Sequence, residues 1–278
     1  MRAEPMAEVA PYGTWASPVT AADVASEDGR PAWPGWVSGD LWWTEPRPNE
    51  GGRVTLMRRR SPTAAAPAGS GTGADDRAGR DGTTRGAGGA GEDAEEMLAA
   101  PWYVRSRVIE YGGHPWAGRP AGSGQSVVFA NWADQRLYRL DPDVPGSVPQ
   151  PVTPVPAISA GMRFADLFIH PDLDEIWCVR ETLTGPAPTD VRRDIVAVPL
   201  DGSAAGDPGL IRVLAASHHF LCCPRLSPDG ERLSWIGWDH PSMPWDETVL
   251  CVAEVSGGKT GPERVVAGGG RQAIVQAE

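Results

Sequence analysis

Residues 218–223, His-His-Phe-Leu-Cys-Cys, bring together several side chains that could bind a metal ion. A structural zinc site needs about four ligands that converge tetrahedrally. Consecutive residues of a strand point to opposite faces, so Cys222 and Cys223 are not expected to serve one partner. The sequence therefore predicts no metal site and no cofactor. His218 and His219 are interpreted as loop residues, and the cysteines as reduced, partly buried thiols.

Nucleophilic catalysis would require an exposed serine with its supporting groups. The nucleophile elbow G-x-S-x-G occurs nowhere in the 278 residues. The stretch GAGGAG at 86–91 formally matches G-x-G-x-x-G, but no strand precedes it and no helix follows, which excludes a dinucleotide site. We expect no catalytic residue in this chain, and no hydrolysis of peptides or aminoacyl amides by this chain alone.

The elements that position these residues are predicted to be short strands. Pro224–Leu226 and Arg232–Trp238 flank the turn Ser-Pro-Asp-Gly at 227–230, and a third strand covers Thr248–Val255. A similar pattern recurs about 55 residues earlier, a spacing close to known propeller repeats. The predicted fold is all-β, a partial β-propeller of about four four-stranded blades with a disordered insert.

The composition divides the chain into five parts. Residues 1–30 form an N-terminal segment with a short helix expected over Ala21–Ala25, and 31–60 form the first part of the first blade. Residues 61–100 are rich in Ala, Gly, Asp and Arg and are predicted to be a disordered low-complexity insert. The remaining blades occupy 101–267. Residues 268–278 are expected to begin a further blade, which makes the chain a truncated product.

Charge and targeting signals restrict the partners. The formal net charge of −11 argues against nucleic acid and against anionic membranes as partners. The first residues lack the basic and apolar regions of a signal peptide, and no apolar run approaches the length of a membrane helix. A cytoplasmic location is expected.

One end of the predicted propeller carries most of the candidate functional residues. In a four-stranded blade, the connection between the second and third strands lies at the same end as the connection into the next blade. The candidates for a substrate-facing or domain-interface surface at this end are Arg105, Arg107, Glu110, Tyr111, Arg163, Arg180, Glu181, Trp238, Asp239, His240, Trp245 and Asp246. The alternative is that they are solvated loop residues with structural hydrogen bonds.

Glu110 stands out among these candidates because it precedes Tyr111 and two glycines at the entry to an innermost strand. We expect it to face the propeller channel, on the opposite strand face from Arg107 and Ile109. Its carboxylate has two plausible roles. It could pair with Arg105 or Arg107, or it could attract the free amino group of a short peptide.

Five ordered motifs resemble one peptidase family. They are YGTWASPVTA (12–21), RVIEYGG (107–113), FANWADQRLYRL (129–140), PRLSPDGERLSW (224–235) and WDHPSMPWD (238–246). The chain resembles the N-terminal propeller of bacterial prolyl oligopeptidase-family serine peptidases, in the acylaminoacyl-peptidase and dipeptidyl-aminopeptidase-like branch. In that family the propeller covers an α/β-hydrolase domain with a Ser-Asp-His triad and admits only short peptides or small amides. Ile109 replaces the histidine that usually precedes EYGG.

The resemblance implies a non-catalytic, substrate-gating propeller whose partners are an α/β-hydrolase domain, missing here, and a short peptide or aminoacyl substrate. A second hypothesis is a stand-alone propeller that binds a peptide or protein. A third is an intact enzyme of another kind that uses its own acidic residues. The absent nucleophile disfavours the third hypothesis.

Overall fold

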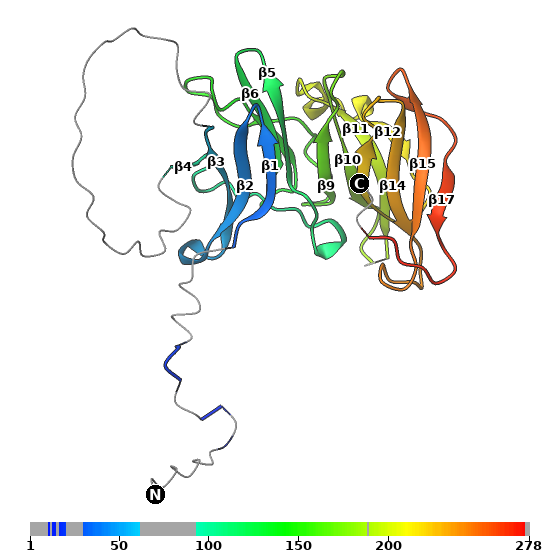
Figure 1. Ribbon diagram of the computed structural model, residues 1–278, viewed down its shortest axis with the longest axis horizontal. Helices are drawn as coiled ribbons and strands as arrows, with labels where there is room; N and C mark the ends of the chain where they lie inside the picture. The colour runs from blue at the N-terminus through cyan, green and yellow to red at the C-terminus, as the bar shows by residue number, and fades with distance from the viewer. Residues whose placement is uncertain are drawn as a thin grey trace, which may run out of the picture.

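The computed structural model describes residues 11, 13–14, 17–20, 30–61, 93–187 and 189–275. Over these residues the chain is all-β. Four antiparallel sheets follow one another along the sequence and stand side by side (Figure 1). This arrangement is consistent with part of a propeller and confirms the predicted fold class. The helix expected over Ala21–Ala25 lies outside the described residues.

Each sheet is built from strands consecutive in sequence. The first contains β1 (Ala32–Val37), β2 (Asp40–Arg47), β3 (Arg53–Arg59) and β4 (Ala94–Glu96). The second contains β5 (Trp116–Ala121), β6 (Gly124–Ala130), β7 (Leu137–Leu140) and β8 (Gln150–Pro151). The third contains β9 (Met162–Ile169), β10 (Glu175–Leu183), β11 (Val191–Pro199) and β12 (Arg212–Ala215). The fourth contains β13 (Phe220–Leu226), β14 (Arg232–Trp238), β15 (Val249–Ser256) and β17 (Arg264–Gly268), with the short β16 (Lys259–Thr260) beside β15.

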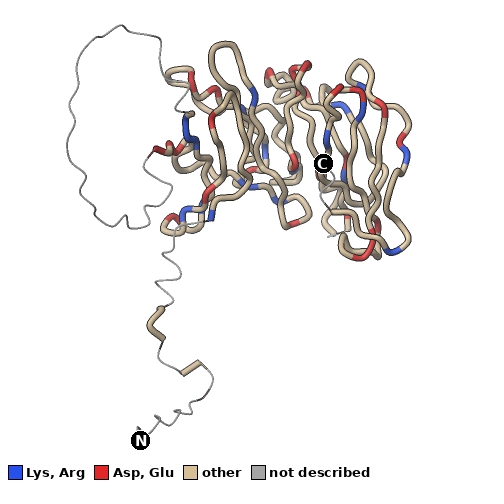
Figure 2. The backbone as a smooth tube through the Cα atoms, in the orientation of Figure 1, with Lys and Arg blue, Asp and Glu red and all other residues tan. Residues whose placement is uncertain are grey.

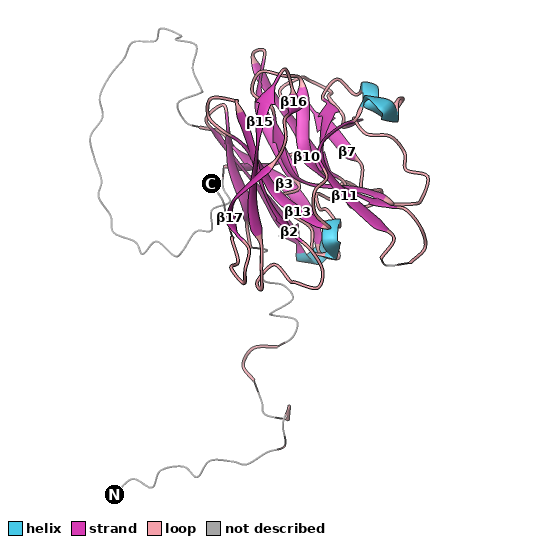
Figure 3. Ribbon diagram, turned by 90° about the vertical axis from the view of Figure 1, so that its right-hand side faces the viewer, coloured by secondary structure: helices cyan, strands magenta, loops and turns pink. Residues whose placement is uncertain are grey.

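Short 3-10 helices lie in the connections between strands, as Figure 3 shows. They are η1 (Pro48–Glu50), η3 (Val108–Glu110), η4 (Ser203–Ala205) and η5 (Pro208–Leu210). Within the described part of the chain, no helix is long and apolar enough to cross a membrane.

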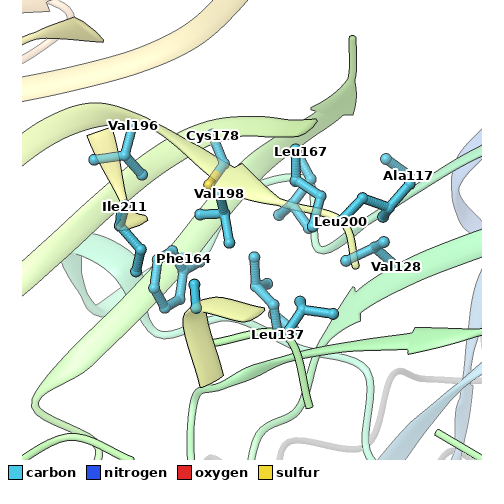
Figure 4. Packing of buried hydrophobic residues seen from close by; sticks show 14 residues of the cluster. Ala117, Val128, Leu137, Phe164, Leu167, Cys178, Val196, Val198, Leu200 and Ile211 are labelled. Atoms are coloured by element: carbon cyan, nitrogen blue, oxygen red, sulfur yellow. The ribbon is translucent and has the colours of Figure 1, made fainter. Parts of the chain in front are cut away.

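The core lies between neighbouring sheets. Strand residues alternate between the two faces, and both faces of an inner sheet are apolar because each packs on a neighbour. On β10, Ile176 and Cys178 face the second sheet, whereas Trp177 and Val179 face the fourth. Figure 4 shows the first of these layers, in which Phe164 and Leu167 meet side chains such as Leu137. Since each layer needs two sheets, neighbouring blades stabilise one another.

The predicted insert at 61–100 is longer than the segment that lacks a described structure. Residues 94–96 form β4, the fourth strand of the first sheet, paired with β3. Leu98 is buried in the core, and its carbonyl accepts hydrogen bonds from Arg53 and Thr55 at 2.9 and 2.7 Å. Composition alone missed this strand because only two large apolar residues follow the low-complexity run. Residues 62–92 lie outside the described part.

Residues 269–275, expected to begin a further blade, contain no strand. This segment instead lies beside Thr248, the residue that precedes β15. The carbonyl of Gln272 accepts a hydrogen bond from the Thr248 backbone at 2.9 Å, and the carbonyl of Ile274 accepts one from the Thr248 hydroxyl at 3.0 Å.

The first strands of neighbouring sheets contact one another: β1 meets β5, β5 meets β9, and β9 meets β13. We call these four the inner strands. Trp33, Asp166 and Cys223 occupy bulges of β1, β9 and β13 and have left-handed φ values of 54, 54 and 55°. His114 lies at the corresponding position just before β5.

These four positions are connected across the sheets. The Trp33 ring stacks on His114 with centroids 5.0 Å apart. One Asp166 oxygen accepts the His114 backbone N–H at 2.9 Å, and the other accepts the Cys223 backbone N–H at 2.9 Å. The Asp166 carboxylate therefore fastens three consecutive inner strands together.

Candidate domain-interface surface

A ladder of charged residues crosses the third sheet near the predicted functional end. Arg163 on β9 and Arg193 on β11 both lie opposite Glu181 on β10. Directly opposed residues of an antiparallel pair share a face, so the three side chains meet. Glu181 is buried and accepts hydrogen bonds from Arg163 at 3.0 Å and from Arg193 at 2.8 Å.

The ladder continues into the connection that precedes β5. Arg163 also donates to Glu110 at 2.6 Å, and Arg107 lies 3.5 Å from the second Glu110 oxygen. The hydrogen bond from Arg163 lowers the pKa of the Glu110 carboxyl, although partial burial opposes this shift. We call Arg107, Glu110, Arg163, Glu181 and Arg193 the ion-pair chain.

The local structure around Glu110 differs from the expected strand. Residues 108–110 form η3, and Ile109 has a left-handed φ of 55°, an outlier for a β-branched residue. The Glu181 carboxylate accepts the Ile109 backbone N–H at 3.0 Å. A buried anion thus holds the strained turn that presents Glu110. Glu110 pairs with Arg163 and Arg107, and no pair with Arg105 forms.

Arg193 joins the ion-pair chain to a group of rings at the start of the fourth sheet. Its guanidinium lies over the Phe220 ring, 4.5 Å from the centroid, and donates to the His219 carbonyl at 3.1 Å. Phe220 stacks on Trp238 at 5.1 Å and meets the His240 ring edge-on at 4.9 Å. We call His219, Phe220, Trp238 and His240 the aromatic cluster.

Asp239 anchors this cluster. Its carboxylate accepts the His219 backbone N–H at 2.7 Å and lies 2.8 Å from His219 Nδ1. Trp238, Asp239 and His240 also line a cavity of about 300 Å³. The structure therefore brings together seven of the twelve predicted residues: Arg107, Glu110, Arg163, Glu181, Trp238, Asp239 and His240.

The other five predicted residues lie apart from these contacts. Arg105 stacks on Trp132 at 4.8 Å, and with Tyr111 it lines a separate cavity of about 220 Å³ beside the first sheet. Arg180 pairs with buried Asp194 at 2.9 and 2.7 Å on the opposite face of the third sheet from Glu181.

The remaining two residues lie in the connection between β14 and β15. The Trp245 ring is 68 % exposed. Asp246 accepts the Met243 backbone N–H at 3.0 Å and thereby closes its own loop.

Sequence reasoning missed Arg193, which links the two halves of the surface, and Trp132, on which Arg105 and Arg107 stack. The sequence offers one signal for Arg193, namely a basic residue near the start of a strand, β11. Choosing it required the register between β10 and β11, which the sequence does not state. Trp132 lies between β6 and β7 within the motif FANWADQRLYRL, which indicated the family resemblance but supplied no site candidate.

One group of potential metal ligands lies elsewhere in the fourth sheet. Within the described residues, ligand atoms of His218, Cys251 and Glu263 lie within 4.8 Å of one another. Burial, followed by the charge of Glu263, raises the pKa of the Cys251 thiol to about 11. Zinc binds the thiolate, so this environment opposes metal binding. The expectation of no metal site stays a prediction.

The ion-pair chain has three guanidinium groups and two carboxylates and so one excess positive charge. Over the molecule as a whole, Figure 2 shows acidic and basic residues interspersed across all four sheets. The Asp239 carboxylate beside the aromatic cluster balances this charge, so the surface combines paired charges with aromatic rings and suits a polar partner.

No protein-family model matches the chain, and no curated protein does. Solved structures do match. A crystal structure of puromycin hydrolase is 46% identical with a TM-score of 0.80, and the alignment covers 98% of this chain and 37% of that one. The same values hold for a mutant of puromycin hydrolase complexed with PGG, with 97% of this chain covered.

A puromycin-hydrolysing peptidase of Mycobacterium tuberculosis is 41% identical with a TM-score of 0.75, and the alignment covers 95% of this chain and 36% of that one. The chain thus spans little more than a third of the length of these relatives. It is a homologue of the propeller region of puromycin-hydrolysing peptidases, of the prolyl oligopeptidase family.

Proposed function

We propose that this chain is the non-catalytic propeller portion of a serine peptidase and gates access of short peptides or aminoacyl amides to an α/β-hydrolase domain. The observation that carries the proposal is the 46% identity to puromycin hydrolase over 98% of this chain. The end formed by the ion-pair chain and the aromatic cluster is the face that meets the hydrolase domain. The exposed Trp245 ring at the same end supplies an apolar anchor of the kind that dominates interfaces.

A chimera tests this proposal. The aligned region of puromycin hydrolase is replaced by this chain, and hydrolysis of an aminoacyl-nitroanilide is compared with hydrolysis of a long unfolded peptide. We expect the chimera to hydrolyse the small substrate and to exclude the long peptide. A chimera that folds and cleaves both with equal kcat/KM contradicts gating. Peptide binding by the chain, with no effect on the hydrolase, favours the stand-alone binding module instead.

The interface is tested by Trp245→Ser in the same chimera. Removal of a large aromatic anchor is expected to lower kcat/KM for the small substrate about tenfold, because the two domains then pack less tightly. Trp36→Ser is the matched control, since Trp36 is 72 % exposed and lies beside the turn between β1 and β2 at the opposite end. Equal effects of the two variants would contradict the assignment of this face.

The two roles of Glu110 are separated by Glu110→Gln in the chimera. Both Glu110 oxygens already face guanidinium groups, and the ion-pair chain keeps one excess positive charge, which disfavours an incoming ammonium group. We therefore expect equal, small changes in KM for free-amine and amino-blocked substrates. The exposed pair should contribute less than about 1 kcal/mol to stability. A rise in KM confined to free-amine substrates would establish amino-group anchoring instead.

A further inference from the structure

The cavity of about 220 Å³ beside the first sheet combines positive charge with aromatic surface. Its lining residues come from β1, β2 and β3 and from the connection that leads into β5. Two of them are arginines, Arg30 and Arg105, and none of the described residues that line the cavity is acidic. Two aromatic residues, Trp33 and Tyr111, also line it and are exposed to solvent. We call this the Arg105 cavity.

The guanidinium group of Arg105 has few protein partners. It lies 4.8 Å from the centre of the Trp132 ring, and Nη1 lies 3.5 Å from the Tyr103 hydroxyl. No other side-chain hydrogen bond and no ion pair of Arg105 occurs among the described residues. Glu110, the acidic residue nearest in sequence, pairs with Arg163 instead. A guanidinium has five N–H donors, so most of those of Arg105 are open to a ligand.

The backbone holds Arg105 in position before a ligand binds. The Arg105 backbone N–H donates to the Ala130 carbonyl at 3.1 Å, and the Trp132 backbone N–H donates to the Tyr103 carbonyl at 2.7 Å. Residues 103–105 are therefore fastened to the end of β6, and Arg105 keeps a fixed place beside the ring on which it stacks. A preorganised group loses less freedom on binding, which favours affinity.

The rest of the cavity lining is mostly apolar and includes one buried hydroxyl group. Val54, Val104 and Pro115 supply the apolar surface. Ser106 is buried, and its hydroxyl accepts the Val108 backbone N–H at 3.1 Å. Within the described part of the chain, the hydroxyl proton has no acceptor, so it can be donated to a ligand. Apolar walls with a few placed polar groups are typical of small-molecule sites.

We propose that the Arg105 cavity binds a small carboxylate with an apolar or aromatic body, and that the carboxylate pairs with Arg105. The planar guanidinium can donate two parallel hydrogen bonds to the two carboxylate oxygens. The body of the ligand packs on the apolar walls and the aromatic rings. The C-terminal carboxylate of a short peptide and a free aromatic acid share this chemistry. The inference is independent of the gating proposal, because residues of this chain alone form the cavity.

The test measures binding to the full chain by isothermal titration calorimetry at low ionic strength. The two probes are N-acetylphenylalanine and N-acetylphenylalaninamide, which have nearly the same size and differ in the charge of the terminal group. We expect the carboxylate to bind in a one-to-one ratio and at least about tenfold more tightly than the amide, because hydrogen bonds between charged groups are the stronger ones. Equal affinities, or no saturable binding of the carboxylate, would overturn the proposal.

Two further probes distinguish the sources of the carboxylate. Acetylglycylphenylalanine carries the C-terminus of a peptide, whereas 3-phenylpropionate is a free aromatic acid. Tighter binding of the first supports a peptide ligand, and tighter binding of the second supports a free acid.

Three variants locate the site. Arg105→Gln should weaken binding of N-acetylphenylalanine about tenfold or more and leave binding of the amide unchanged. Arg105→Lys should have an intermediate effect, since it keeps the charge and loses the planar fork. Arg59→Gln is the matched control, because Arg59 is exposed at the end of β3 and does not line the cavity. Parent-like binding by Arg105→Gln, or an equal loss in Arg59→Gln, would contradict the assignment of Arg105.

Discussion

Replacing Glu181 by glutamine is expected to lower the free energy of unfolding by about 3 to 5 kcal/mol, the range seen when one partner of a buried ion pair is removed. Glu181 is 2 % exposed and accepts hydrogen bonds from Arg163, Arg193 and the Ile109 backbone. A neutral amide leaves two guanidinium groups without their shared anion in a partly dehydrated site. Urea unfolding followed by tryptophan fluorescence measures the change.

The matched control is Glu254→Gln. Glu254 also pairs with an arginine across neighbouring strands, at 3.4 Å, but its side chain is 65 % exposed. Such a surface pair contributes roughly 0 to 1 kcal/mol, because water and salt screen it. If the two variants lose similar stability, the buried carboxylate does not organise this surface. The Glu181 variant should also increase hydrogen exchange at the Ile109 amide, because that N–H loses its charged acceptor.

Acidification from pH 6.5 to 4 is expected to destabilise the chain through His114. Burial, the largest cause, lowers the pKa of His114 from 6.5 to about 4; the charge of Asp166 opposes this shift and that of Arg225 adds to it. Between these two values the unfolded chain binds a proton that the folded chain does not. Stability from His114 is therefore complete above pH 6.5 and falls as the pH drops, by up to about 3 kcal/mol.

His114→Phe isolates this contribution from that of the other titrating groups. The His114 ring stacks on Trp33 and meets Trp116 edge-on, and its Nε2 atom has no hydrogen-bond partner. A phenyl ring preserves the ring packing and cannot take up a proton. Measured by urea unfolding, the free energy of unfolding of the parent should fall by up to about 3 kcal/mol relative to that of the variant as the pH drops from 6.5 to 4. His170, whose pKa burial also lowers, titrates in both proteins and cancels in the difference. Parallel curves would contradict the assignment.

Much of the fold was predictable because its signals are local. The Ser-Pro-Asp-Gly turn, the alternation of Leu233 and Trp235 with their neighbours, and the repeat at about 55 residues identified the blades. Strands β14 and β15 begin within one residue of the predicted positions. The five motifs also indicated the peptidase family, in agreement with the 46% identity to puromycin hydrolase.

The tertiary structure decided which candidate residues meet. Arg180 and Glu181 are adjacent in sequence, yet they face opposite sides of the third sheet and join different ion pairs. Arg193 became part of the surface only through the register of β10 with β11, because partners across a ladder depend on how two distant segments align.

The sequence patterns also did not predict the bulges or the residues with left-handed φ values. Cys223 and Ile109 have side chains that favour extended backbone in isolation. Packing, together with hydrogen bonds that their backbone N–H groups donate to the Asp166 and Glu181 carboxylates, holds them at φ values near 55°. The sequence thus determined where strands and turns form, since those depend on neighbouring residues. Tertiary structure determined the ion-pair chain and the Asp166 contacts between inner strands, since these depend on segments far apart in the chain.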